Sequence, residues 1–198
     1  MSRLIQMAFK CYSLADLFWF ELEDDIGFFV RPLPGVLGFW ARYLAYKPLC
    51  KRIASCPYIF PNVRIAYMRR LSLGRSVKLN VNIFIDARGG VDIGDDVLIG
   101  PNSVLASGEH DIAGDVLISG QASHGRPIRI GTGAWIGANC VIRGGVTIGE
   151  HCVIGAGSVV TKDTDAYGIY AGAPAKKLRD RRDPLPQATQ TPSKECHE

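Results

Sequence analysis

Aliphatic residues recur at every sixth position along the second half of the chain. The clearest series consists of Ile130, Ile136, Ile142, Ile148, Ile154 and Val160. A glycine or another small residue usually follows each of them. A six-residue period matches neither the 3.6-residue turn of a helix nor the alternation of a long strand. Short extended segments joined by turns at a fixed spacing are typical of a parallel β-helix.

Three such units make one coil, so residues 18 positions apart are predicted to stack about 4.8 Å from each other. Ile148 is then expected to lie against Ile130, and Ile154 against Ile136, in continuous aliphatic columns inside the coil. Four glycines directly follow aliphatic positions, and we expect them to adopt the positive φ values that tight corners need. They are Gly131, Gly137, Gly149 and Gly155.

A weaker form of the same register runs upstream. Two sets of aliphatic residues keep the six-residue spacing: Leu73, Leu79 and Ile85, then Ile93, Ile99 and Leu105. Two additional residues near Gly89 and Gly90 separate the sets. We therefore predict a β-helix over residues 61–165 with a single interruption. The unbroken repeats disfavour the alternative, a sandwich of short strands with regular turns.

The register weakens between Leu105 and Ile130. Continuing it would place His124 inside the coil, where a polar ring is costly to bury. We therefore predict an excursion loop over about residues 107–127, which rejoins the coil after Pro127. Long loops in compact domains are often functional.

Residues 1–60 differ in composition, because they are aromatic and amphipathic, with Pro32 and Pro34 between two predicted helices. One interpretation is a cap that covers unpaired backbone at the open end of the β-helix. The other is a membrane-surface segment. The aromatic and basic residues of that second interpretation are Trp19, Phe28, Phe29, Phe39, Trp40, Arg31, Arg42, Lys47, Lys51 and Arg52.

The C-terminal part of the chain leaves the repeat. Residues 166–182 are basic, and Pro174 is predicted to begin a short helix there. Residues 183–198 are polar and proline-rich, as in a flexible tail. The predicted fold class is therefore an all-β core, a parallel β-helix with a helical N-terminal segment and a short C-terminal helix.

Composition narrows the class of protein. The net charge of +4 over 198 residues is too small to argue for nucleic-acid binding. Six cysteines form no CxxC pair and lie beside no metal-spaced histidine, so we expect a reduced, cytoplasmic chain without a metal site.

Met1–Lys10 lacks the features of a signal peptide. The uncharged run Pro32–Ala41 is far shorter than the ~20 residues that span a membrane. The membrane contact that we still expect is a peripheral one, at the inner face of the membrane.

Four stretches of the chain carry a recognisable pattern: "GEHDI" (108–112), "PIRIGTGAWIGANCVIRGGVTIG" (127–149), "VIGAGSVVTKD" (153–163) and "YAGAPAKKLR" (170–179). On these motifs, residues 93–180 resemble the hexapeptide-repeat acyltransferases, in particular the branch of sugar O-acetyltransferases that includes galactoside, maltose and colanic-acid acetyltransferases. The resemblance implies left-handed coils, acetyl-CoA as acyl donor, and a homotrimer with active sites between subunits.

Transfer of an acetyl group to a hydroxyl needs a base for the hydroxyl proton. His110 is the candidate, because an imidazole titrates near neutrality and this one lies in the excursion loop. It also matches the family's catalytic histidine. Glu109 or Asp111 could orient its ring, although neighbours in sequence do not normally point the same way. His124, in the same loop, is a second candidate and matches no family motif.

The donor is expected along one corner of the coil. Gly137-Ala138 and Gly155-Ala156 are 18 positions apart, so they stack and leave room for a thin pantetheine arm. Corner geometry alone would also explain the glycines. By resemblance, Trp135 lies near the thioester, Ala138 and Ala156 contact pantetheine, and Lys162, Lys176 and Arg179 lie near the nucleotide. Gly137 and Gly155, which stack at the same corner, complete the predicted donor-binding set.

Together these features predict an acetyl-CoA-dependent O-acetyltransferase that acts on a sugar hydroxyl of a glycan or glycolipid precursor in polysaccharide biosynthesis. A nucleotide-sugar N-acetyltransferase and a serine acetyltransferase-like enzyme share the fold and the donor, and both remain alternatives. A non-catalytic scaffold would not need His110.

Overall fold

The computed structural model describes residues 14–184. Several predictions lie outside this range: the interpretation of Met1–Lys10, the free thiols of Cys11 and Cys196, and the tail beyond residue 184.

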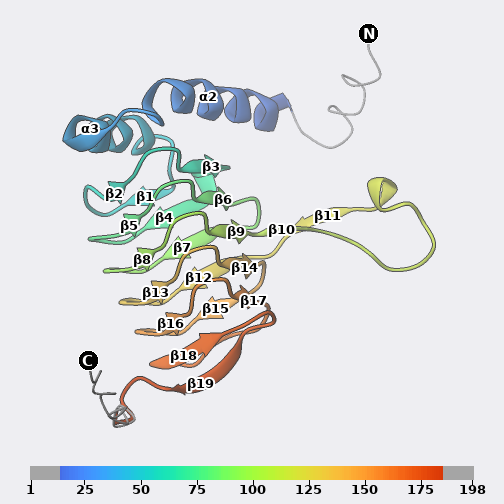
Figure 1. The fold of residues 1–198 in the computed structure, drawn as a ribbon. Helices are drawn as coiled ribbons and strands as arrows, with labels where there is room; N and C mark the ends of the chain where they lie inside the picture. The colour runs from blue at the N-terminus through green and yellow to red at the C-terminus, as the bar shows by residue number, and fades with distance from the viewer. Residues whose placement is uncertain (1–13, 185–198) are drawn as a thin grey trace, which may run out of the picture.

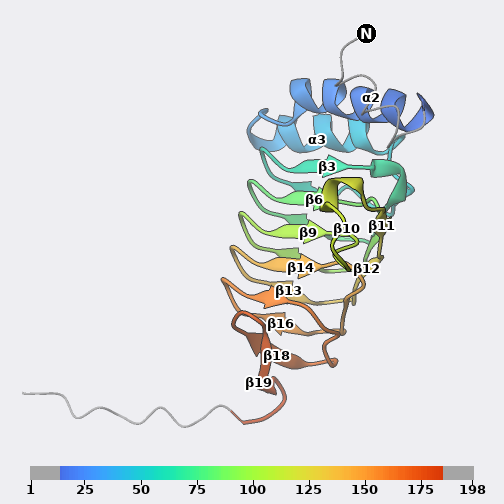
Figure 2. The same ribbon diagram turned by 90° about the vertical axis from the view of Figure 1, so that its right-hand side faces the viewer.

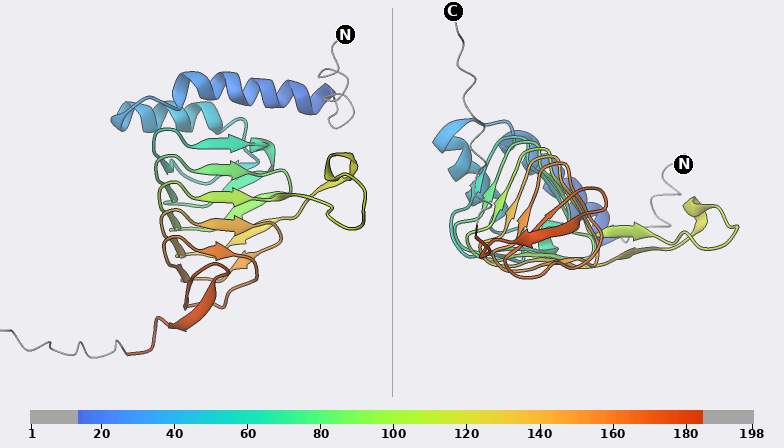
Figure 3. Two further views of the ribbon diagram at one scale, coloured as in Figure 1. Left: turned by 45° about the vertical axis from the view of Figure 1, so that its right-hand side comes forward. Right: turned by 60° about the horizontal axis from the view of Figure 1, so that its bottom comes forward.

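The chain winds into a three-sided parallel β-solenoid whose coils stack along one axis (Figures 1 and 3). Face A contains β1 (Arg52–Ile53), β4 (Leu71–Leu73), β7 (Val91–Ile93), β12 (Ile128–Ile130) and β15 (Thr147–Ile148). Face B contains β2 (Tyr58–Ile59), β5 (Lys78–Leu79), β8 (Leu98–Ile99), β13 (Trp135–Ile136), β16 (Val153–Ile154) and β18 (Gly168–Ala171). Face C contains β3 (Arg64–Ala66), β6 (Phe84–Asp86), β9 (Val104–Ala106), β14 (Val141–Arg143) and β17 (Val159–Val160). The chain visits the faces in the order A, B, C, and we name each corner after the two faces it joins.

The predicted aliphatic columns are confirmed. Ile130 pairs with Ile148 on face A, and Ile136 pairs with Ile154 on face B, each 18 positions apart. All four side chains are at most 3% exposed. Because each coil repeats the same inward aliphatic positions, the core is one continuous column of Ile, Leu and Val side chains.

The prediction of positive φ at the four glycines is wrong, and the reason lies in the stacking of the coils. Positive φ occurs two positions later in each unit, at Gly133, Asn139, Gly145, His151 and Gly157. At Gly137 an added Cβ would lie 2.6 Å from the backbone nitrogen of Ala156 in the next coil. Glycine is therefore needed at this position for the close approach of two backbones.

The upstream coils are longer than predicted. Leu73 pairs with Ile93 and Ile65 pairs with Ile85, in each case 20 positions apart. The additional residues fall at corner CA of each early coil. At one of these corners the chain forms the 3-10 helix η1 (Met68–Arg70). The prediction of a single interruption is therefore wrong, because the same corner is extended repeatedly.

The largest extension of corner CA is a hairpin that projects from the solenoid (Figure 1). β10 (Gly108–His110) pairs antiparallel with β11 (Ser123–Gly125) at its base. The 3-10 helix η2 (Ile118–Gly120) lies near its tip. The excursion predicted over residues 107–127 thus has the form of a two-stranded ribbon, and His124 lies on it outside the core.

Two helices, α2 (Leu14–Val30) and α3 (Gly35–Tyr46), lie across the N-terminal end of the solenoid (Figures 1 and 2). Arg42 of α3 is fully buried beneath them. Its Nε donates to the carbonyl of Ile59 at 2.7 Å, and its Nη1 donates to the carbonyls of Val30, Arg31 and Leu33. Burial lowers the pKa of Arg42. One guanidinium therefore joins the end of α2, the interhelical turn and the first coil.

Two of the basic residues that we expected on a membrane-facing surface are engaged within the protein instead. Arg42 is buried, and Arg31 is tied to the carboxylate of Asp24 at 2.8 Å. Trp19 is partly buried, with the guanidinium of Arg69 5.0 Å from its ring centroid. None of the helices described is long and apolar enough to cross a bilayer.

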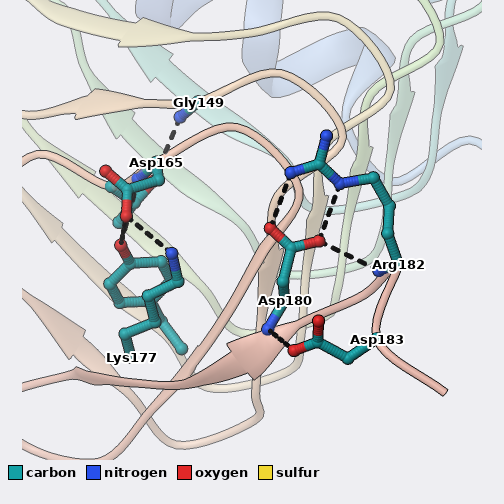
Figure 4. Close-up of polar contacts among 8 residues, drawn as sticks. Gly149, Asp165, Lys177, Asp180, Arg182 and Asp183 are labelled. Atoms are coloured by element: carbon teal, nitrogen blue, oxygen red, sulfur yellow. Dashed lines mark hydrogen bonds and ion pairs between the residues drawn. The ribbon is translucent and has the colours of Figure 1, made fainter. Parts of the chain in front are cut away.

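The prediction of a C-terminal helix is wrong. Residues after the last coil form a hairpin in which β18 pairs antiparallel with β19 (Lys176–Asp180), with Pro174 in the turn. Lys177 of β19 donates to Asp165 at 2.8 Å, and Arg182 holds Asp180 at the end of β19 through two side-chain bonds (Figure 4). The bond from Lys177 lowers the pKa of Asp165, and the bonds from Arg182 lower that of Asp180.

Candidate active site

His110 is the last residue of β10, at the base of the projecting hairpin, and its side chain is exposed. It lines a shallow hollow of about 430 Å³. Successive side chains on a strand point to opposite sides, so the side chain of His110 is directed away from that of Glu109 although both residues line this hollow. The remaining residues of the hollow are Glu109, Asp111, Ile112, Ala113, His124, Arg126 and Arg143.

Both acids that flank His110 are bonded to other side chains. Asp111 Oδ1 lies 2.6 Å from His124 Nε2, because the antiparallel pairing brings these two residues to the same side. Glu109 accepts from Arg143 Nε at 2.5 Å and lies 3.6 Å from Arg126 Nε. Within residues 14–184, no hydrogen bond reaches the imidazole of His110. An orienting role for Glu109 or Asp111 stays a prediction, and the structure gives each of them a different partner.

The arginines that hold Glu109 were missed from the sequence. Arg143 directly follows Ile142, in the unit position where Gly131, Gly137 and Gly149 stand elsewhere. A long basic side chain at a position that is otherwise small is a signal that could have identified it. Arg126, at the return of the hairpin, carries no comparable signal.

The predicted pantetheine residues lie at corner BC, between β13 and β14 in one coil and between β16 and β17 in the next. Ala138 is half-buried and Ala156 is exposed on this edge. Stacking of the coils accounts for Gly137, as described above. Gly155 is also confined, since an added Cβ would lie 3.0 Å from the Cβ of Ala171. The two alanines are therefore the residues of this set whose small size is not explained by packing.

The remaining predicted donor residues are distributed over two regions. Trp135 is 54% exposed on face B, where it pairs with Leu98 and Val153. Lys176 and Arg179 lie on β19, which extends the same sheet. Lys162 follows β17 and lies at corner CA instead. Among residues 14–184, no three His, Cys, Asp or Glu side chains gather as a metal site would require.

The two halves of the predicted site occupy different corners of the same protomer. His110 projects from corner CA, whereas Ala138 and Ala156 line corner BC. The hairpin leaves the solenoid and extends away from it (Figure 3). One protomer therefore does not bring the imidazole and the pantetheine corner together.

Residues 127–162 match the family model described as bacterial transferase hexapeptide (six repeats). The chain is 36% identical over 137 residues to galactoside O-acetyltransferase of Escherichia coli K12, which covers 69% of this chain and 67% of that protein. It is 31% identical over 148 residues to the putative colanic acid biosynthesis acetyltransferase WcaF of the same organism, which covers 75% and 79%.

Among solved structures, the hexapeptide-repeat-containing acetyltransferase of Vibrio cholerae complexed with acetyl-CoA is similar in fold. The TM-score is 0.79 at 26% identity, over 92% of this chain and 100% of that one. These likenesses confirm the left-handed β-helix.

Proposed function

The chain belongs to the hexapeptide-repeat acetyltransferases, and on that premise we propose that it transfers the acetyl group of acetyl-CoA to a sugar hydroxyl of a glycan or glycolipid precursor. Acyl transfer is the activity that its relatives share by name. A sugar acceptor is favoured because galactoside and colanic-acid acetyltransferases are among the relatives that align with most of the solenoid.

His110 acts as the general base in this proposal. Its imidazole removes the proton from the acceptor hydroxyl while the hydroxyl oxygen attacks the thioester carbonyl. The carbon–sulfur bond then breaks, the acetyl group stays on the acceptor oxygen, and the CoA thiolate leaves and takes up a proton. The exposed position of His110 in a hollow open to solvent suits an acceptor that enters from outside the coil.

The observation that supports a site shared between subunits is the separation of His110 from corner BC within one protomer. A complete site therefore requires corner BC of a second copy to approach the hairpin of the first. A cyclic trimer supplies three equivalent contacts of this kind, each between one hairpin and one neighbouring corner. We therefore propose a homotrimer with its active sites between subunits.

Replacing Ala138 with tryptophan tests the donor corner. The indole would fill the edge along which the pantetheine arm lies, so we expect the KM for acetyl-CoA to rise about tenfold or more. Ala166→Trp is the matched control, because Ala166 is exposed at a different corner of the same solenoid. A KM that rises equally in both variants, or in neither, would contradict this placement of the donor.

An acceptor panel scored by release of free CoA thiol tests the reaction itself. We expect release above the hydrolytic background with sugars that carry free hydroxyls, and little with L-serine or amino-sugar nucleotides. Turnover confined to an amino-sugar nucleotide would favour the N-acetyltransferase alternative, and turnover confined to serine would favour the serine acetyltransferase alternative. Release with none of these acceptors would contradict the proposal.

A further inference from the structure

We propose that an apolar surface on the two N-terminal helices inserts into the interfacial region of a lipid bilayer. We call this surface the helical apolar face. It consists of Phe28, Phe29, Val36, Leu37, Trp40 and Leu44. The inference concerns these helices alone and does not depend on the acetyl transfer.

All six side chains of the helical apolar face are between 52 and 76% exposed. On α3 the exposed and buried residues fall on opposite sides of the helix. Gly38, Arg42 and Tyr46 are buried toward the first coil, and the exposed apolar residues follow each other at helical spacing on the other side. Phe28 and Phe29 are also exposed, at the end of α2 just before the turn into α3.

A surface of this kind indicates a binding site. Single exposed apolar residues are normal on soluble proteins, but large side chains gathered on two adjacent helices mark a contact site. Phe, Trp and Leu are the residues that interfacial helices place below the lipid headgroups. The helices lie across the end of the solenoid, so the coils do not stand between this surface and a membrane (Figures 1 and 2).

The charges on the helices favour apolar insertion over attraction to anionic lipid. Arg31 and Arg42 are engaged within the protein, and Lys47, just after α3, donates to the hydroxyl of Tyr43 at 3.0 Å. Glu21 and Asp25 are exposed on α2. We therefore expect binding to neutral phosphatidylcholine, with little dependence on salt.

Two other occupants fit the surface less well. Residues 1–13 join α2 at Leu14, about 21 Å along the helix from Phe28, so they would have to double back along α2 to reach this surface. A second copy packed through a twofold axis would have to place the same surface against itself. A bilayer requires neither arrangement.

Flotation of the full-length protein with phosphatidylcholine vesicles tests the proposal. We expect the wild type to float with the vesicles at both low and high salt. The double variant Leu37→Glu, Leu44→Glu places two charges on the helical apolar face and should lower the bound fraction at least about tenfold. Leu178→Glu is the matched control, because Leu178 is 65% exposed on β19 at the other end of the solenoid. This control should float like the wild type.

Circular dichroism and sedimentation complete the experiment. If the double variant loses helix content, the milder variant Leu37→Ser replaces it, with an expected loss of about threefold. The proposal is overturned if the wild type does not float, or if folded variants of this face float as well as Leu178→Glu. If the wild type does not float but sediments with a doubled mass, and the double variant Leu37→Glu, Leu44→Glu sediments with half that mass, the face binds a second copy of the chain. Flotation gained only after deletion of residues 2–13 would assign it to that segment.

Discussion

Replacing His110 with alanine is expected to lower kcat by about 10²–10⁴-fold, because the acceptor hydroxyl loses the group that removes its proton. The KM for acetyl-CoA should change little, since corner BC holds the donor in this account. Unfolding of the variant should match the wild type, because His110 is exposed and contributes no packing. Steady-state release of CoA thiol, measured with a saturating acceptor, gives both constants.

His124→Ala is the matched control for this prediction. It removes an imidazole from the same hollow, and one that lies 2.6 Å from a carboxylate. We expect His124 to position Asp111 and the hairpin, so its loss should lower kcat less than tenfold. A larger fall for His124→Ala than for His110→Ala would reverse the assignment and make the Asp111–His124 pair the base.

Replacing Arg42 with methionine is expected to cost about 3–5 kcal/mol of the free energy of unfolding. Four backbone carbonyls each lose a hydrogen bond from the guanidinium, and three of them lie at the end of α2 or in the turn that follows. Lysine should not restore stability, because a single ammonium cannot reach the same carbonyls as a planar guanidinium. Urea unfolding followed by circular dichroism at the helix band measures the effect.

Arg75→Met provides the control for Arg42→Met. Arg75 also makes strong polar contacts, with two nitrogens bonded to Asp95, but its side chain is 73% exposed. Exposed ion pairs contribute at most about 1 kcal/mol, so this variant should unfold close to the wild type. Equal losses in the two variants would show that burial of Arg42 does not decide its contribution.

The sequence was sufficient for the solenoid because its register follows from the chain alone. Each aliphatic residue at a six-residue interval must face inward, which fixes the pairing of Ile130 with Ile148 without any further information. The roles of the glycines could not be obtained in this way. Whether Gly137 bends the chain or admits a neighbouring backbone depends on the distance to the next coil, which only the folded structure provides.

The ends of the chain were harder to predict because tertiary contacts decide them. Residues 176–180 have no repeat, and they form a strand because β18 offers an open sheet edge. Arg42 looked like a surface cation in the sequence, and it is buried because carbonyls from α2 and the first coil converge on it. The partners of Glu109 and Asp111 likewise depend on how the hairpin pairs.

We propose that each active site combines the hairpin of one subunit with corner BC of another. Mixed assemblies of His110→Ala and Ala138→Trp subunits distinguish this arrangement from a site within one subunit when they are assayed at an acetyl-CoA concentration far below the KM of the Ala138 variant. Random mixing in equal amounts should restore about a quarter of the wild-type rate, because about one interface in four then pairs an intact hairpin with an intact corner. A mixture no more active than the average of its two parents would contradict the shared site.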